Sequence, residues 1–284
     1  MSDISKGLIE LLNPSKSNED KPSLLPYIFS LNTLLKMTIE ERLFLLIEFC
    51  PVNSIGMVFA QRRIGKSWFC MQLAIAISEG HQHVFGWKIH DTGPVLYIDG
   101  EMTLSDIKTR FSQLSDKSLT NENLMILPSE TLFKDSTPIK IDEPSERRRI
   151  LSLLHDLEST GRRPKLIILD NLSTLRGPGS DENSNSDEEP LMNFLNELRH
   201  MGHAVLVVHH AGKSGAQRGA SKKEDIMDYV IKLERTTQGA SNGAEFKLSF
   251  SKMRHRLPSP EEFECKLVED KLGQLHMTTS IAND

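Results

Sequence analysis

Apolar residues along this chain fall into two patterns that alternate. Short apolar runs of strand length lie at 55–59, 95–98, 166–169 and 204–208. Runs without polar alternation are typical of strands buried on both faces, as in a parallel sheet covered by helices. The sequence therefore predicts an α/β fold built on a mostly parallel sheet.

Between these runs, apolar residues recur at the spacing of amphipathic helices. The pattern predicts helices over 68–78, 104–114, 144–160 and 191–200. The stretch 177–190 is rich in Gly, Ser, Asn and acidic residues and has nothing to bury. We expect it to form a mobile loop.

The last third of the chain departs from this alternation. A tight turn is predicted at 217–221, followed by a helix over 225–233. Residues 246–254 alternate apolar and polar side chains, which is typical of an antiparallel strand with one exposed face. We expect this strand near an edge of the sheet, as part of an antiparallel C-terminal region.

The two ends of the chain carry less core signal. Helical spacing extends over 24–49 and is clearest over 39–47, so we expect a helical lead-in. Its role is left open between covering one edge of the core and docking onto another subunit. The expected organisation is a tail and lead-in over 1–50, a main domain over 51–268 and a C-terminal tail over 269–284.

Charge and cysteine content exclude some classes of protein. The 284 residues carry a formal charge of −5, so binding to nucleic acid would require a local basic patch. Cys50, Cys70 and Cys265 lie far apart and lack zinc-ligand spacing, which predicts reduced thiols. No apolar run reaches membrane-spanning length and the first residues lack a signal-peptide pattern. We therefore expect a cytoplasmic protein without a membrane partner.

The stretch FAQRRIGKSWF, at 59–69, lies between a predicted strand and a predicted helix. It matches the Walker A pattern G-x-x-x-x-G-K-S/T, except that Ala60 stands at the first glycine. In such a loop, backbone N–H groups cradle phosphates, Lys66 adds positive charge and the Ser67 hydroxyl ligates Mg²⁺. The alternative is a chance Gly-Lys-Ser sequence in an unrelated turn. The predicted nucleotide-binding residues are Ala60, Gln61, Arg62, Arg63, Ile64, Gly65, Lys66, Ser67 and Trp68.

Three carboxylates follow predicted strands. Asp99 and Glu101 close one apolar run and Asp170 closes another. Ligands of open α/β sheets bind beyond the carboxyl ends of strands, so Asp99 and Glu101 would approach the phosphate loop if their strand lay beside it. Glu101 fits either a general base or an ordinary acid that caps the next helix. Asp170 has the form of a Walker B acid, which would hold Mg²⁺ together with Ser67.

A pair of histidines, His209 and His210, ends the apolar run at 204–208. One interpretation is a metal site, but adjacent residues of a strand point to opposite faces and no further ligand set lies nearby in sequence. The other interpretation is that one histidine faces the nucleotide and senses its γ-phosphate, while its neighbour packs or contacts another group.

Two cations end the alternating strand at 246–254. Lys252 and Arg254 are two residues apart, so their side chains share one face of that strand. They fit either a solvated basic strand end or a functional pair.

Five stretches together resemble a known family. FAQRRIGKS, VLYIDGE, LIILDNLS, VLVVHHAGK with QRGAS, and FSKMR occur in the order found in RecA-like P-loop ATPases of the plasmid RepA type, relatives of the DnaB-family hexameric replicative helicases. The resemblance covers 51–257. It implies a RecA-like P-loop NTPase fold, with a mostly parallel twisted sheet flanked by helices and antiparallel C-terminal strands. It also implies that Ser67 and Asp170 hold Mg²⁺.

The resemblance also implies catalytic roles for particular residues. Lys66 would contact phosphate, and Glu101 would activate the attacking water. His210 matches the sensor that couples the γ-phosphate to DNA-binding loops. Lys252 and Arg254 match a K-x-R element that reaches into the site of a neighbouring subunit.

The function implied by the family is Mg²⁺-dependent ATP hydrolysis by a homo-oligomer. The family further implies a hexameric ring that acts on single-stranded DNA, with replication proteins as partners. This would be a helicase or DNA-loading role in a plasmid, phage or mobile element. The acidic loop at 181–189 departs from the basic loop that DNA binding favours. A second interpretation is therefore an ATP-dependent assembly switch or recombination mediator. A small-molecule kinase fits less well, because no separate lid for a phosphate acceptor is evident.

Overall fold

The computed structural model describes residues 23–39, 42–46, 49–115, 120–177, 185–211, 224–236, 244–271 and 273–280, with only the backbone of 185–187. Its contacts divide the chain into two compact units, Met1–Glu41 and Arg42–Asp284. The turn predicted at 217–221 lies outside the described residues.

Within its described part, the first unit contains the 3-10 helix η2 (Leu25–Tyr27) and the short helix α2 (Leu31–Lys36). Ser30 caps α2, because its side chain accepts a hydrogen bond from the backbone N–H of Thr33 at 3.1 Å. Exposed apolar side chains crowded into one stretch are uncommon on the surface of a monomeric protein. Those of this unit are Leu24, Leu25, Tyr27, Ile28, Phe29, Leu31, Leu34, Leu35, Met37 and Ile39.

The helix predicted over 39–47 is wrong, because Phe44–Leu46 forms strand β1 and pairs with strand β2 (Cys50–Pro51). The carbonyl oxygen of Leu45 accepts a hydrogen bond from the backbone N–H of His90 at 2.9 Å, and the Leu45 side chain is buried. A short apolar run fits either a helix or a strand, and contacts with a distant segment decide between them here.

The limits of the main unit also differ from those expected. Strands β1 and β2 lie in the unit Arg42–Asp284 rather than in a lead-in that ends at residue 50. Strand β13 (Leu275–Ser280) pairs with strand β12 (Phe263–Glu269), so the sheet continues past residue 268. Hydrogen bonds between strands extend the unit at both ends.

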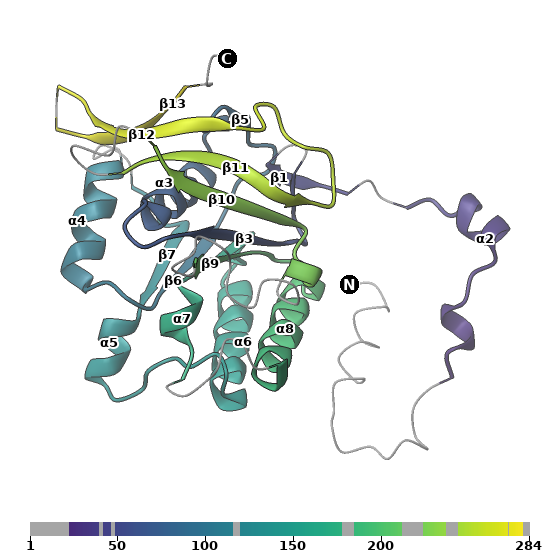
Figure 1. The fold of residues 1–284 in the computed structure, drawn as a ribbon. Helices are drawn as coiled ribbons and strands as arrows, with labels where there is room; N and C mark the ends of the chain where they lie inside the picture. The colour runs from purple at the N-terminus through teal and green to yellow at the C-terminus, as the bar shows by residue number, and fades with distance from the viewer. Residues whose placement is uncertain are drawn as a thin grey trace. The chain divides into compact units, whose positions relative to one another are not determined.

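One sheet organises the second unit. Among the described residues it has nine strands, in the order β13-β12-β11-β10-β3-β9-β8-β6-β7. The strands from β10 to β7 run parallel, and β11, β12 and β13 are antiparallel to their neighbours. This confirms the predicted sheet (Figure 1). The remaining strands are β3 (Ile55–Ala60), β6 (Val95–Asp99), β7 (Leu124–Pro128), β8 (Leu166–Asp170), β9 (Ala204–His210), β10 (Tyr229–Arg235) and β11 (Glu245–Met253), with a separate hairpin of β4 (His83–Val84) and β5 (Trp87–Lys88).

Helices cover both faces of the parallel part of the sheet (Figure 1). Helices α3 (Lys66–Ser78) and α4 (Leu104–Leu114) pack on one face. The other face is covered by α6 (Pro144–Ser159), α7 (Leu172–Leu175) and α8 (Asn185–His200), and α5 (Ser129–Lys134) follows β7. None of the described helices is long and apolar enough to cross a membrane.

Side chains of the parallel strands alternate between these two layers. In β8, Leu166 and Ile168 pack with the layer that contains α3, whereas Ile167 and Leu169 pack with the layer that contains α6. Both sets are buried. Successive side chains of a strand point to opposite faces, so covering both faces requires continuous apolar runs.

The helix predicted over 225–233 is wrong, because most of that range belongs to strand β10. This strand pairs with β3 on one side and with β11 on the other, so it is buried between two neighbours. The strand predicted at 246–254 is confirmed as β11, but it does not lie near an edge, since β12 and β13 lie beyond it.

The loop predicted over 177–190 ends earlier than expected, because α8 begins at Asn185. Buried Glu188 forms an ion pair with Arg176 across the base of this segment. Acidic residues favour a helix N-terminus, which explains how a stretch that resembles a loop by composition can begin a helix. Residues 178–184 lie outside the described part of the chain.

Candidate functional site

The predicted phosphate loop lies between β3 and α3, at the carboxyl end of the sheet. Gly65 precedes α3 with a φ of 120°, and a Cβ at this position would lie 2.6 Å from the Cβ of Ala244. Glycine is therefore required there by both conformation and space. Ala60 instead ends β3, in register with His210, so a methyl group is compatible with the first motif position. The N-cap residue provides no side-chain hydrogen bond, and the first N–H groups of α3 face the loop as donors for an anion.

Lys66 begins α3 and is buried beneath the loop. Its Nζ donates hydrogen bonds to the carbonyl oxygens of Ala60 and Gln61, each at 3.0 Å. Burial lowers the pKa of Lys66 to about 8, because the ammonium group loses hydration, and the nearby Asp170 carboxylate opposes this shift. A phosphate group in the loop would supply the negative charge that this buried cation lacks.

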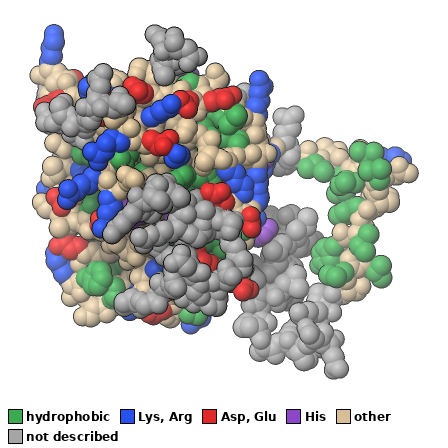
Figure 2. Space-filling view, in the orientation of Figure 1, with side chains coloured by type: hydrophobic (Ala, Val, Ile, Leu, Met, Phe, Trp, Pro, Cys, Tyr) green, Lys and Arg blue, Asp and Glu red, His purple; other side chains and the backbone are tan. Residues whose placement is uncertain are grey.

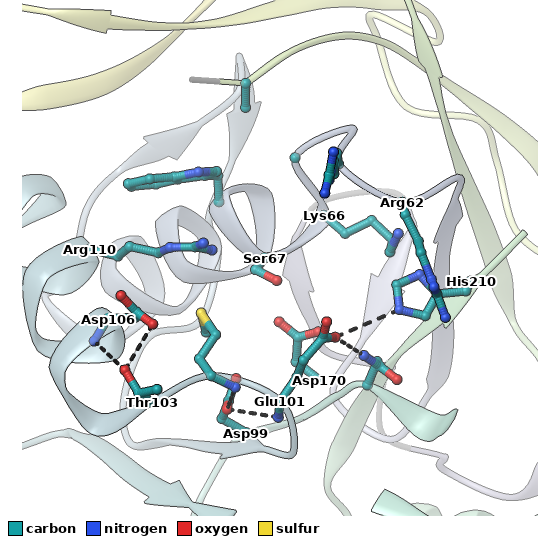
Figure 3. A pocket seen from close by; sticks show the side chains of 16 residues that line it. Arg62, Lys66, Ser67, Asp99, Glu101, Thr103, Asp106, Arg110, Asp170 and His210 are labelled. Atoms are coloured by element: carbon teal, nitrogen blue, oxygen red, sulfur yellow. Dashed lines mark hydrogen bonds and ion pairs between the residues drawn. The ribbon is translucent and has the colours of Figure 1, made fainter. Parts of the chain in front are cut away.

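Asp170 ends β8 beside the start of α3. Its Oδ2 accepts a hydrogen bond from the Tyr97 hydroxyl at 2.5 Å, and the Ser67 hydroxyl also hydrogen-bonds to this carboxylate. Burial raises the pKa of Asp170, and the two hydrogen bonds oppose that rise. Ser67 and Asp170 thus form a pair of oxygen donors on the floor of the site (Figure 3).

Glu101 lies just beyond the end of β6 and is held by two neighbours. The Nδ2 of Asn171 donates a hydrogen bond to Glu101 Oε2 at 2.6 Å, and Nε2 of His210 lies 3.7 Å from the same oxygen. The Glu101 side chain is 59% exposed, so water has access to it. Burial, followed by the charge of Lys66, lowers the pKa of His210. At physiological pH the neutral imidazole can therefore donate a hydrogen bond to the Glu101 carboxylate.

The approach of Glu101 to the phosphate loop has a different cause from the one expected. Strand β6 does not lie beside β3, because β9 and β8 lie between them. All four strands are parallel, however, and their carboxyl ends meet at one edge. Asp99 is in register with Asp170, and Ala60 with His210. Register across the sheet therefore assembles the site, rather than direct pairing of β6 with β3.

Asp99 stabilises the backbone that directly follows β6. Its Oδ1 accepts hydrogen bonds from the backbone N–H groups of Glu101 at 3.1 Å and Met102 at 2.7 Å. Its Oδ2 is buried without a hydrogen-bond partner, and burial raises the pKa of Asp99 to about 7. A buried acceptor of this kind calls for a donor such as a bound water molecule.

The residues at this edge fit Mg²⁺. This ion prefers oxygen ligands and retains several water molecules, usually beside substrate phosphates. Ser67 and Asp170 offer oxygen ligands, and the unpartnered oxygen of Asp99 can accept a hydrogen bond from a coordinated water. Among the described residues, no group of three or more His, Cys, Asp or Glu side chains could hold a metal unaided. Phosphate and water would have to complete the coordination.

These side chains border one open pocket of about 690 Å³, within the usual range for small-molecule sites (Figure 3). At one end the Arg110 guanidinium lies over the Trp68 ring, with its carbon 5.1 Å from the ring centroid. This pair offers a flat surface beside the phosphate loop. The pocket is lined by Arg62, Arg63, Gly65, Lys66, Ser67, Trp68, Asp99, Glu101, Met102, Thr103, Asp106, Arg110, Asp170, Asn171, His210 and Ala244.

The pocket brings together most of the residues predicted from sequence. Of the nucleotide-binding stretch, Ala60 and Gln61 contribute carbonyl oxygens to Lys66, and Ile64 is buried. His210 lines the pocket, whereas His209 is fully buried in β9. The two histidines therefore do not form one site.

Lys252 and Arg254 lie toward the opposite end of the strands, on the side where β3 begins. Lys252 pairs in register with Val230, which pairs with Met57 at the amino end of β3. At roughly 3.3 Å per residue, Arg254 is about 17 Å along the strand direction from Ala60. Neither cation lines the pocket of its own chain.

Three contributors to the pocket were not identified from sequence. Tyr97 holds Asp170, Asn171 holds Glu101, and Arg110 stacks on Trp68. Asn171 carries a weak sequence signal, because it directly follows the predicted Walker B acid. Tyr97 looks like one more apolar strand residue, and Arg110 like one more exposed helical cation.

Comparison with known proteins identifies the family. An AAA domain family, AAA_25, matches residues 24–216, more than half of the chain, so the chain belongs to this family. Its fold is similar to that of the flagellar accessory protein FlaH from Methanocaldococcus jannaschii, at 15% identity and a TM-score of 0.53, over 81% of this chain and 90% of that one. It is also similar to a KaiC-like protein from Pyrococcus horikoshii OT3, at 14% identity and a TM-score of 0.56, over 84% and 99%. No curated protein sequence gives a significant match.

These findings define a P-loop ATPase domain with a RecA-like fold. The family implies that the chain binds nucleotide.

The burial of Asp170 predicts a gain in stability when its charge is removed. The folded-state pKa is raised above the ordinary 3.8, so the folded protein binds more protons between pH 3.8 and the raised value, and stability falls as the pH rises through that window. We expect Asp170→Asn to raise the melting temperature of the nucleotide-free protein at pH 7, with a smaller gain near pH 4. Asp156→Asn, at an exposed helix position, should change neither value. A variant that melts below wild type at pH 7 would contradict the account of a carboxylate strained by burial.

Proposed function

We propose that this protein hydrolyses ATP with Mg²⁺ as a head-to-tail oligomer. The observation that carries the proposal is the pocket in which Lys66, Ser67, Asp170 and Glu101 converge around a helix N-terminus. Oxygen donors, a buried cation and an exposed carboxylate are the groups that phosphoryl transfer to water requires.

The phosphate loop and its neighbours provide the groups that would bind the substrate. The N–H groups at the start of α3 and the Lys66 ammonium would hold the phosphates, and Ser67 with Asp170 would hold the metal ion. When bound, Mg²⁺ neutralises charge that develops on the transferred phosphoryl group. The Arg110 and Trp68 pair provides a surface on which the nucleobase can stack.

Attack by water depends on Glu101. Its Oε2 is oriented by Asn171 and lies within reach of His210, so one carboxylate oxygen is fixed while the group stays open to solvent. We propose that Glu101 accepts the proton of the attacking water, and that His210 senses the γ-phosphate through its contact with Glu101.

The oligomer is proposed because Lys252 and Arg254, the pair that matches the K-x-R element, do not line the pocket of their own chain. Arginine fingers contribute ~10³-fold or more to such reactions. Lys252 and Arg254 lie toward the end of the strands that is far from the pocket of their own chain. A head-to-tail arrangement would bring that end to the pocket of a second copy and close into a ring. Their placement supports catalysis between subunits, and a hexameric ring is the form that we propose.

We further propose a role in DNA replication of a plasmid, phage or mobile element, as a RepA-type helicase or loading ATPase that acts on single-stranded DNA. The second candidate is an ATP-dependent assembly switch or recombination mediator. The formal charge of −5 and the acidic composition of the sequence at 181–189 favour this second candidate, because phosphate backbones require cations.

Glu101→Gln should keep nucleotide affinity and lower turnover by ~10²-fold or more, since the amide can still accept from Asn171 but is too weak a base to take a proton. Titration with a fluorescent nucleotide and steady-state phosphate release measure the two quantities. Glu122→Gln, at an exposed position, is the matched control. A parallel loss of affinity would instead make Glu101 a binding group.

Mixed oligomers test the composite site. We expect Lys66→Ala and Arg254→Ala to be inactive alone, the first through loss of phosphate binding and the second through loss of the finger. In a 1:1 mixture of a head-to-tail ring, roughly a quarter of the interfaces pair an intact loop with an intact finger, so activity should reappear. If the mixture stays inactive while sedimentation shows mixed assembly, catalysis does not cross the interface.

Binding to single-stranded DNA separates the two candidate functions. With ATP present, a replication motor should bind such DNA with a log affinity that falls by about 0.7 per phosphate contact for each decade of salt. Filter binding across a salt series measures this slope. Absence of binding at low salt would exclude the replication role and favour the assembly switch.

A further inference from the structure

A buried carboxylate lies where the parallel strands begin, and the proposed chemistry leaves it unexplained. Asp228 directly precedes β10, and its side chain is only 4% exposed. Its Oδ2 accepts a hydrogen bond from the backbone N–H of Ile55, the first residue of β3, at 2.9 Å. This carboxylate therefore holds the start of the strand that carries the phosphate loop at its other end.

Several cations surround this single acid. Oδ1 of Asp228 lies 3.8 Å from Nη2 of Arg42 and 3.8 Å from Nη1 of Arg254, and Oδ2 lies 3.6 Å from Nη1 of Arg199. Nη1 of Arg42 lies 2.8 Å from Nε2 of His255. A guanidinium group can only donate, so the imidazole accepts this bond and is neutral. Three guanidinium groups thus share one buried carboxylate.

Arg254 is the member of this cluster that is fixed from two sides. One amino group donates to the carbonyl oxygen of Asp225, while the other faces the carboxylate of Asp228. Its backbone N–H also donates to the carbonyl oxygen of Asp228 at 2.8 Å. The side chain stays 40% exposed. Both amino groups of its guanidinium are therefore oriented by its own chain, while the exposed part of the side chain stays accessible to a second molecule.

The same end of the strands is basic at the molecular surface. Figure 2 shows Lys and Arg side chains at the edge of the second unit where β11 ends in Figure 1. Lys252 is anchored in the same way as Arg254, because its Nζ donates to the carbonyl oxygen of Glu224. Carbonyl oxygens of Glu224 and Asp225 therefore hold both cations.

We propose that Asp228 is the positioning residue for the cation that acts on a neighbouring subunit's nucleotide. It orients Arg254 toward the second copy, and through Ile55 it fixes that cation to the strand that leads to the phosphate loop of its own subunit. This inference rests on the composite site proposed above. It assigns a role to a residue that does not itself touch nucleotide.

Asp228→Asn tests the inference. Asparagine keeps an oxygen that can accept from Ile55, so the phosphate loop strand should stay in place, but the charge that holds Arg254 is lost. We expect normal nucleotide affinity and a turnover lowered by ~10²-fold, the scale for a misplaced catalytic group. Glu234→Gln, which neutralises an exposed carboxylate on the same strand, is the matched control and should keep wild-type turnover.

Mixed oligomers distinguish positioning of the finger from a general structural defect. In a mixture of Asp228→Asn with Lys66→Ala, intact loops of the first meet intact fingers of the second, so activity should reappear to the same extent as with Arg254→Ala and Lys66→Ala. The mixture of Asp228→Asn with Arg254→Ala should stay inactive, because neither subunit offers a working finger.

Four results would overturn the inference. Wild-type turnover of Asp228→Asn, or failure of its mixture with Lys66→Ala while Arg254→Ala and Lys66→Ala recover, would overturn the positioning role alone. Failure of both mixtures would remove the composite site as well. Should Asp228→Asn not assemble, Arg254→Lys carries the test, because lysine keeps the charge but cannot span the Asp225 carbonyl and the Asp228 carboxylate together. Loss of turnover in that variant supports the role, and full turnover overturns it.

Discussion

The buried pair of charges beneath the phosphate loop is the interaction on which the site depends. Lys66 and Asp170 are both removed from water. Burial lowers the pKa of Lys66 and raises the pKa of Asp170, so it favours the neutral form of each. Carbonyl oxygens of the loop and the hydroxyls of Tyr97 and Ser67 stabilise these charges only in part. Burying these two charges therefore costs stability, and a bound phosphate with its metal ion would offset that cost.

Two groups of functional residues lie at opposite ends of the parallel strands. The carboxyl ends of β3, β9, β8 and β6 form the candidate nucleotide pocket, and the amino end of β3 carries the cluster around Asp228. A single strand joins them, from Ile55 to Ala60. Since a rigid sheet cannot fold one end of its strands onto the other, the composite site that we propose would take its cation from a second copy. Strand β3 would then link the two ends physically.

Much of this architecture could be predicted from the sequence, because the relevant signals are local. A strand buried on both faces needs a continuous apolar run, and the runs at 55–59, 166–169 and 204–208 are strands in the structure. The phosphate loop is a contiguous motif whose glycine and lysine act through their own backbone and side chain. Hence the fold class and the position of Lys66 followed from residue order alone.

Only the tertiary structure decided what depends on distant partners. Stretches 39–47 and 225–233 have apolar spacing that fits a helix, but hydrogen bonds to other segments make parts of both into strands. The contacts of Tyr97 with Asp170, and of Asp228 with Arg254, likewise join residues far apart in the chain. Sequence determines the chemistry that each residue can offer. Strand order and register determine which residues meet, because they arise from long-range pairing that no local pattern encodes.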